Sequence, residues 1–280
     1  MSDNAQLVLA RQLSGLFACF PQVEAIALSG SLTSGAAFDP ASDIDLYVFT
    51  TAPVPLEQRL NLVESAGGAS LANMNLDYWD VGDEWFHKPS GIEVDVIYWD
   101  MGWMEAILAR VLKQHQASAG YSTCHWQTIR NAQILFDRSG WLAQLKLRCE
   151  EPFPEELRRA IILRNHALLR GVIPAFLYQV EKAAKRGDLV SVNHRIAALL
   201  ASYFDILFAV NKVLHPGEKR LIEQAERLCL SLPLGMADQV RAVLRTASLP
   251  GMGVVAEINI LLDQLDLWLE NKEDWFIAKV

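Results

Sequence analysis

Three aspartates have the type and spacing that phosphate chemistry requires. Asp43 and Asp45 lie two residues apart at the start of an apolar run, and Asp95 stands inside the apolar segment 92–97. Side chains two apart on a strand leave the same face, so Asp43 and Asp45 can share one cation. Mg²⁺ prefers oxygen ligands, and paired metal ions can hold the entering and leaving oxygens of a displacement at phosphorus. The aspartates therefore predict a Mg²⁺ site for transfer of a phosphate-containing group, in which Asp95 forms the third wall.

A glycine–serine step precedes the aspartates, at Gly30 and Ser31. Glycine lets the backbone approach a ligand closely and adopt positive φ, and the serine hydroxyl is a hydrogen-bond donor. The segment 31–37 can also present N–H groups at the start of a helix, where phosphates bind well. Gly30 and Ser31 are therefore the expected seat of a nucleoside triphosphate.

The elements that must position these residues alternate between strands and helices as far as Gly140. Apolar periodicity predicts helices before the first strand and between later ones. The predicted strands are 23–28, 43–50, a hairpin of 77–88 and 91–99, and 132–137, with helices at 4–19, 55–66 and 101–115. Asp95 falls on the second strand of the hairpin, beside the strand that follows Asp43. Four tryptophans gather around this hairpin, and packing is the expected use of most of them.

Beyond Gly140 helical periodicity runs almost without interruption. The predicted helices are 141–150, 154–186, 188–214, 218–230, 235–246 and 254–270. We therefore expect an α+β protein: a mixed sheet flanked by helices over residues 1–139, followed by an all-α bundle over 140–280 that selects the substrate.

Composition and charge narrow the partners. The 280 residues are 51 % hydrophobic with a net charge of -8. This favours a globular protein with a small-molecule acceptor over a nucleic-acid binder, which would gather Lys and Arg. No apolar run reaches the roughly 18 residues that span a bilayer, so we expect a cytoplasmic protein without membrane contact. The four cysteines lack metal-ligand spacing and are expected to be reduced and mostly buried.

The motif GSLTSG at 30–35, followed by SDIDL at 42–46, resembles the polymerase-β-like nucleotidyltransferase superfamily, specifically its small antibiotic-type and minimal members with a helical C-terminal domain. The resemblance covers about residues 20–138. It implies Mg²⁺ on Asp43 and Asp45, and a third acid, Asp95, that completes the metal site or accepts the acceptor's proton. Many relatives carry a basic residue where this chain has Ser34.

The helical half resembles a less characterised bacterial group of such transferases through RGDL at 186–189, FAVNK at 208–212 and HPGEKR at 215–220. This second resemblance implies that Lys212 and Lys219 supply the positive charge for the triphosphate, because Ser34 stands where many relatives have a basic residue.

Several alternatives stay open at this point. Glu93 shares the face of Asp95 by the period of two and is a second candidate for the general base. The leading function is transfer of AMP from ATP to a hydroxyl of a small acceptor, such as an aminoglycoside-like antibiotic. A protein-modifying, AMPylating transferase and a catalytically silent nucleotide-binding module are the alternatives. The sequence leaves four properties open: the base preference, the acceptor, the number of metals and the oligomeric state.

Overall fold

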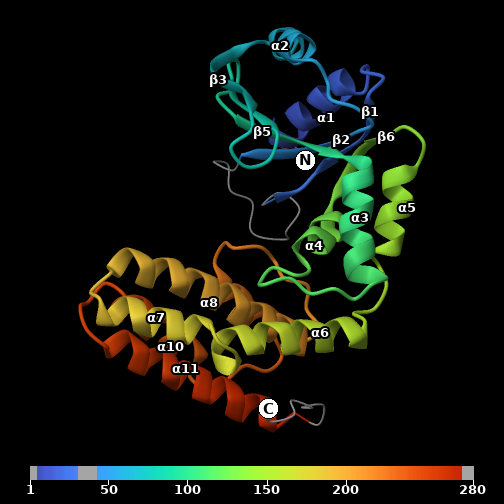
Figure 1. Cartoon of the computed structure of the whole chain (residues 1–280). Coiled ribbons are helices and arrows are strands. Elements are labelled where there is room, and N and C mark those ends of the chain that lie inside the picture. The colour runs from blue at the N-terminus through green and yellow to red at the C-terminus, as the bar shows by residue number, and fades with distance from the viewer. Residues whose placement is uncertain (1–4, 31–42, 273–280) are drawn as a thin grey trace. The chain divides into compact units, whose positions relative to one another are not determined.

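The computed structural model describes residues 5–30 and 43–272, and it contains a six-stranded mixed sheet (Figure 1). The strand order is β3-β4-β5-β2-β1-β6. Neighbouring strands are antiparallel except β2 and β5, which run parallel. The strands are β1 (Val23–Leu28), β2 (Ile44–Thr50), β3 (Ala69–Leu76), β4 (Gly82–His87), β5 (Glu93–Asp100) and β6 (Gln133–Asp137). The predicted mixed sheet followed by helices is confirmed.

One face of this sheet forms the core with two helices, α1 (Ala5–Phe17) and α2 (Leu56–Ser65). Leu9, Leu13 and Phe17 recur at helical spacing on α1 and are buried against the sheet. Three more helices lie next to the last strands in the sequence: α3 (Met101–Leu112) and α4 (Cys124–Asn131) come between β5 and β6, and α5 (Trp141–Arg148) follows β6. The core face is therefore fixed by alternation along each strand, which sends every second side chain to the opposite face.

The chain divides into two compact units. The sheet unit comprises the described residues up to Ala109 and Thr128–Glu151, and the helical unit comprises Arg110–Gln127 and the described residues from Pro152 onward. The chain thus passes from one unit to the other more than once. The boundary at residue 140 stays a prediction about domain organisation.

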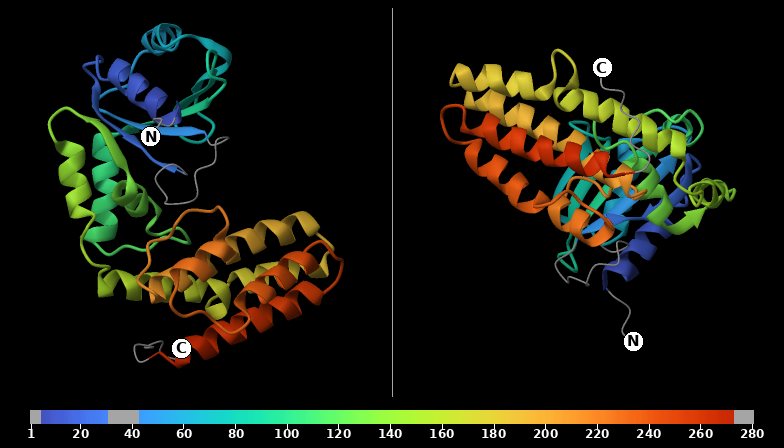
Figure 2. Two further views of the ribbon diagram at one scale, coloured as in Figure 1. Left: turned by 180° about the vertical axis from the view of Figure 1, so that it is seen from behind. Right: turned by 90° about the horizontal axis from the view of Figure 1, so that it is seen from below.

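The helical unit is a bundle around α8 (Leu189–Val210). Every residue from Ala201 to Ala209 is buried, so this part of α8 is enclosed on all sides. Figure 2 shows the yellow, orange and red helices of this unit side by side. Besides α8, the unit contains α6 (Glu155–His166), the π-helical turn η2 (Ala167–Gly171), α7 (Phe176–Lys185), α9 (Leu221–Leu228), α10 (Met236–Thr246) and α11 (Gly253–Glu270).

The single helix predicted over 154–186 is wrong. The chain forms α6 and η2, leaves helical geometry at Val172, and restarts as α7. Pro174 explains the break, because proline lacks the N–H that a continuous helix needs and disfavours helical geometry at the residue before it. β3 and α4 were not predicted from the sequence.

The stretch Glu155–Lys185 is long and apolar enough, by length and composition alone, to cross a membrane. One such stretch is weak evidence for a membrane-spanning helix, because the core helix of a soluble protein passes the same test. Here the stretch is also divided into α6, η2 and α7. The four cysteines, all within the described residues, form no disulfide, as expected. Only Cys149 is buried, however, so the expectation that most thiols are buried is wrong.

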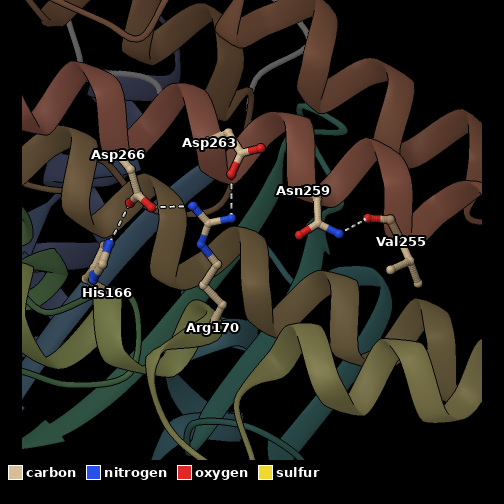
Figure 3. A network of polar contacts seen from close by, with 6 residues as sticks. All are labelled: His166, Arg170, Val255, Asn259, Asp263 and Asp266. Carbon is tan, nitrogen blue, oxygen red and sulfur yellow. Dashed lines mark hydrogen bonds and ion pairs between the residues drawn. The ribbon is translucent and has the colours of Figure 1, made fainter. Parts of the chain in front are cut away.

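A polar network fastens the π-helical turn to α11 (Figure 3). His166 Nε2 lies 2.7 Å from Asp266 Oδ1, and Arg170 pairs with both Asp266 and Asp263, the latter at 2.7 Å. Both acids stand on α11, one turn apart. The network therefore holds an irregular turn of the chain at a defined position against a regular helix.

Replacing Asp266 with asparagine should destabilise the helical unit by about 1.5–3 kcal/mol, the usual value of hydrogen bonds to charged groups. Burial by itself raises the pKa of Asp266, but hydrogen bonds from His166 and Arg170 outweigh burial and lower the pKa below its ordinary value. The contribution of Asp266 is therefore present above an ordinary carboxyl pKa of about 3.9 and is lost as pH falls through the lower folded-state pKa.

Urea unfolding of wild type and Asp266→Asn over a pH series measures this difference. The difference in the free energy of unfolding between the two proteins should be largest near neutral pH and should disappear in strong acid. Asp238→Asn is the control, because Asp238 is exposed and its ion pair with Arg241 is a surface pair worth about 0–1 kcal/mol. A gap that does not change with pH would contradict the role of the Asp266 carboxylate.

Candidate active site

Three carboxylates form one row across the middle of the sheet. In the parallel pairing of β2 and β5, Asp45 lies directly opposite Asp95. In the antiparallel pairing of β4 and β5, Glu84 lies directly opposite Asp95 from the other side. Asn73 of β3 in turn lies opposite Glu84. We call Asp45, Asp95 and Glu84 the acid row. The structure thus brings together two of the predicted acids and adds a third that sequence reasoning missed.

Two further carboxylates surround the row. Asp43 immediately precedes β2, and Glu93 begins β5 two residues before Asp95. Burial, followed by the charges of Asp45, Glu84, Asp43 and Glu93, raises the pKa of Asp95 to about 6. Each of the four acids acts in the same direction because like charges disfavour a further ionisation. The face therefore carries a concentrated negative potential centred on Asp95.

The apolar residues between these acids lie on the opposite face. Ile44, Leu46, Val94 and Val96 are fully buried in the core beneath α1 and α2. Because alternate residues of a strand point to opposite faces, this burial fixes the acids on the other face of the sheet. Local apolar patterning thus determines where the carboxylates point.

Gly30 packs directly against the Asp45 carboxylate. The Ser29 N–H donates to the Asp45 carbonyl at 3.1 Å, which carries the chain out of β1 beside β2. Gly30 then has φ +70°, and a β-carbon built there would overlap Asp45 Oδ2 and come within 2.6 Å of Cγ. Both the backbone conformation and the close approach require glycine. The chain at residue 30 is therefore shaped around one acid of the row.

Substituting alanine at Gly30 should displace the Asp45 carboxylate and strain the backbone. We expect a stability loss of about 1–3 kcal/mol from the left-handed conformation and a loss of any Asp45-dependent activity. Thermal unfolding and the transfer assay described below would measure both effects. Gly140→Ala is a matched control, because Gly140 also has positive φ but has no atom near its β-carbon position. Equal losses of activity in the two variants would contradict a role for the contact with Asp45.

Aromatic side chains continue the same face beyond the acids. The Tyr47 and Trp99 rings stack with centroids 4.2 Å apart and an interplanar angle of 17°, and Trp103 lies tilted against Trp99 at 5.9 Å. Burial, Asp45, Asp95 and Asp80 together raise the pKa of Tyr47 above its usual range. The Tyr47 phenol therefore stays protonated near the acid row. Of the tryptophans at the hairpin, Trp85 is buried as expected, whereas Trp79 is 91 % exposed.

A buried ion pair anchors the strand that carries Glu84. Asp83, the neighbour of Glu84, points to the other side of β4 and meets Arg59 of α2 at 2.5 Å. Asp83 also accepts hydrogen bonds from the Tyr98 hydroxyl at 2.7 Å and the Asn75 N–H at 2.7 Å. Asn75 has positive φ, so this network holds the turn into the β3–β4 connection. It fixes β4, and with it Glu84, in register with Asp95.

The other predicted phosphate ligands lie elsewhere. Ser31 is outside the described residues. Lys212 and Lys219 belong to the helical unit, where both are exposed. Lys212 follows α8 with positive φ, and its ammonium lies 3.5 Å from Glu155 Oε2. The role of the two lysines as triphosphate ligands stays a prediction.

Among the residues that the structure describes, no group of three or more acidic, histidine or cysteine side chains is already arranged to hold a metal ion. The donor chemistry of the acid row nevertheless suits a hard divalent cation, because carboxylate oxygens are the ligands that Mg²⁺ prefers. Burial first, and then the charges of the neighbouring carboxylates, raise the pKa of Asp95, so the fully ionised row is disfavoured without a counter-charge. A bound cation would supply that counter-charge, so the residues fit the predicted metal.

Residues 122–221 match a family described as a domain of unknown function (DUF4037). No curated protein matches the chain. Among solved structures, the chain is similar to a nucleotidyltransferase-like protein from Exiguobacterium sibiricum, with 16 % identity, TM-score 0.43, and 95 % of this chain and 74 % of that chain covered.

Two further solved structures show fainter likeness. Spectinomycin adenyltransferase AAD(9) from Enterococcus faecialis, with ATP and spectinomycin, has 11 % identity and TM-score 0.29 over 93 % of this chain and 98 % of that chain. The STING-associated CdnE c-di-GMP synthase from Capnocytophaga granulosa has 14 % identity and TM-score 0.27 over 98 % and 81 %.

Proposed function

We propose that this chain is a Mg²⁺-dependent nucleotidyltransferase of the polymerase-β-like superfamily that moves AMP from ATP to a hydroxyl of a small-molecule acceptor. The observation that carries the proposal is the register that aligns Asp45 with Asp95, with Gly30 packed against Asp45. Two carboxylates on neighbouring strands can hold a metal ion, and the metal ion can bind a triphosphate beside the glycine turn. This arrangement suits a metal-bound triphosphate better than any neutral ligand. The acidic surface favours a cationic acceptor, such as an aminoglycoside-like molecule.

Each residue of the site has a separate role in this reaction. Asp43 and Asp45 would hold Mg²⁺, which neutralises charge on the phosphates when it is bound. Gly30, together with Ser31, would leave room for the phosphate oxygens. Asp95 would complete the metal site or accept the proton of the acceptor hydroxyl, and its raised pKa of about 6 suits a base that works near neutrality.

In the proposed step a bond from the acceptor oxygen to phosphorus forms as a phosphoanhydride bond breaks. The acceptor oxygen attacks the α-phosphorus of ATP while its proton passes to a carboxylate of the site. The bond from the α-phosphorus to the bridging oxygen breaks, and pyrophosphate leaves. The chain therefore supplies orientation and a proton acceptor, and no covalent enzyme intermediate is required.

An acceptor screen tests the proposal. Purified protein, Mg²⁺ and labelled ATP are incubated with aminoglycosides, other hydroxylated small molecules and candidate proteins, and pyrophosphate release and acceptor labelling are measured. We expect label on a small molecule, with both signals lost when the metal is chelated. Label on a protein would indicate the AMPylating alternative. Metal-dependent ATP binding without pyrophosphate release for any acceptor would indicate a silent binding module and overturn the proposal.

A further inference from the structure

β3 forms one edge of the sheet, and among the described strands it pairs only with β4. Its outer side therefore carries backbone N–H and C=O groups that no other strand of the described residues uses. Residues 70–73 are all exposed, which places both faces of the strand in contact with solvent, and Leu71 is 60 % exposed. This edge is open in its backbone, and its exposed side chains are small or uncharged, with Leu71 as the one large apolar residue among them.

Protein sheets usually protect such an edge with lysine, proline, inward charges, β-bulges or a very short strand. The eight residues of β3, ASLANMNL, contain no charged residue and no proline. Register irregularities occur between Ala69 and Leu71 and between Asn73 and Leu76, which leaves the segment 71–73 regularly paired. The opposite edge strand, β6, is shorter and ends at Asp137, whose carboxylate accepts hydrogen bonds from the first turn of α5. β3 thus lacks the usual side-chain defences against pairing.

The charges at the two ends of β3 indicate which strand fits this edge. Asp77 and Asp80 follow its C-terminal end. Lys88 lies at the other end, because its N–H donates to the Gly68 carbonyl at 2.9 Å, and Glu64 is also near Gly68. An antiparallel pair of two β3 strands places the acidic end of each copy beside the mixed Lys88 and Glu64 end of the other, whereas a parallel pair places both acidic ends together.

The aromatic pair Tyr78 and Trp79 strengthens this preference. Both rings are exposed at the acidic end of β3 and lie edge to face, with centroids 6.2 Å apart. In the antiparallel arrangement they come near Lys88 of the second copy, and aromatic faces attract ammonium groups. Because β3 itself is uncharged, its self-pairing brings no like charges into register. We infer that β3 is a dimerisation edge that pairs antiparallel with β3 of a second copy of this chain.

Sedimentation velocity of the full chain over a concentration series tests the inference. The wild type should form a dimer, and Leu71→Lys should raise the dissociation constant roughly tenfold or more, because two-fold symmetry introduces each unpaired charge twice. Leu230→Lys is the matched control, since Leu230 is 99 % exposed on a loop of the helical unit. The control should dimerise as the wild type does.

Hydrogen exchange on the wild type provides a measurement that needs no variant. Amides of residues 70–74 should exchange more slowly as the protein concentration rises through the dimerisation range. A monomer at every concentration would overturn the inference and leave the edge to a strand from a different protein. A dimer whose β3 amides gain no protection, or one that Leu71→Lys leaves as tight as Leu230→Lys does, would also overturn it.

Discussion

Replacing Asp45 with asparagine should reduce nucleotidyl transfer by at least about 10²-fold, the scale on which enzymes lose rate when one electrostatic contact to the reacting phosphates is removed. The substitution keeps the size of the side chain that contacts Gly30, so the packing of the turn is preserved. It removes one charge from the acid row and with it a ligand for the proposed cation. Initial rates of pyrophosphate release at saturating Mg²⁺ and ATP measure the effect.

The same assay requires a variant that changes charge without touching the site. Asp238→Asn removes a carboxylate that is 91 % exposed on the helical unit and should leave the rate unchanged. Asp95→Asn should lose activity as Asp45→Asn does, because the two side chains occupy one register position. An Asp45→Asn protein that folds normally and retains the wild-type rate would contradict the proposed metal site.

Replacing Arg59 with methionine should destabilise the sheet unit by about 3–5 kcal/mol, the usual effect of leaving one member of a buried ion pair uncompensated. The Arg59 and Asp83 side chains are 6 % and 1 % exposed, so water cannot substitute for the missing guanidinium. Methionine retains apolar bulk near Tyr98 but makes none of the hydrogen bonds to Asp83, Asn75 or Val54. Chemical unfolding monitored by tryptophan fluorescence would report the loss.

Lys185→Met is the control for charge removal alone. The Lys185 ammonium pairs with Glu181 one turn away on an exposed helix surface, and such pairs contribute about 0–1 kcal/mol. If Arg59→Met costs no more than Lys185→Met, the Arg59–Asp83 pair does not hold β4 in place. The register that aligns Glu84 with Asp95 would then need another cause.

The sequence predicted the central strands well because their signals are local. β1 and β2 begin and end within a residue of expectation, since an apolar run flanked by polar residues specifies both the strand and its buried face. Asp45 and Asp95 could be identified for the same reason, as acids inside apolar runs. Their direct opposition in the parallel ladder is a matter of register, which single-strand patterns indicate only indirectly.

Glu84 was missed because its importance depends on that register. In the sequence it is one of two adjacent acids, Asp83 and Glu84, and their residue types alone do not show which one faces the core. Only the pairing of β4 with β5 sends Asp83 toward Arg59 and Glu84 toward Asp95. The alternating strand period, applied from the buried Trp85, is the signal that would have placed Glu84 on the acid face.

β3 was missed for a different reason. Its residues alternate little in polarity and are largely exposed, so neither apolar periodicity nor burial marks it as a strand. The break between α6 and α7 did have a visible signal, Pro174, which the strong helical periodicity on both sides outweighed in the prediction. The exposed edge strand β3 and the interruption between α6 and α7 are thus the parts of this fold that local patterns specify least.

Anomalous scattering from Mn²⁺ in crystals grown with a non-hydrolysable ATP analogue would locate the cation that the acid row is proposed to bind. We expect a peak within coordination distance of carboxylate oxygens of Asp43 and Asp45, with phosphate oxygens of the analogue beside Gly30. A nucleotide-bound Mn²⁺ that contacts neither aspartate would contradict the assignment of this face of the sheet as the active site.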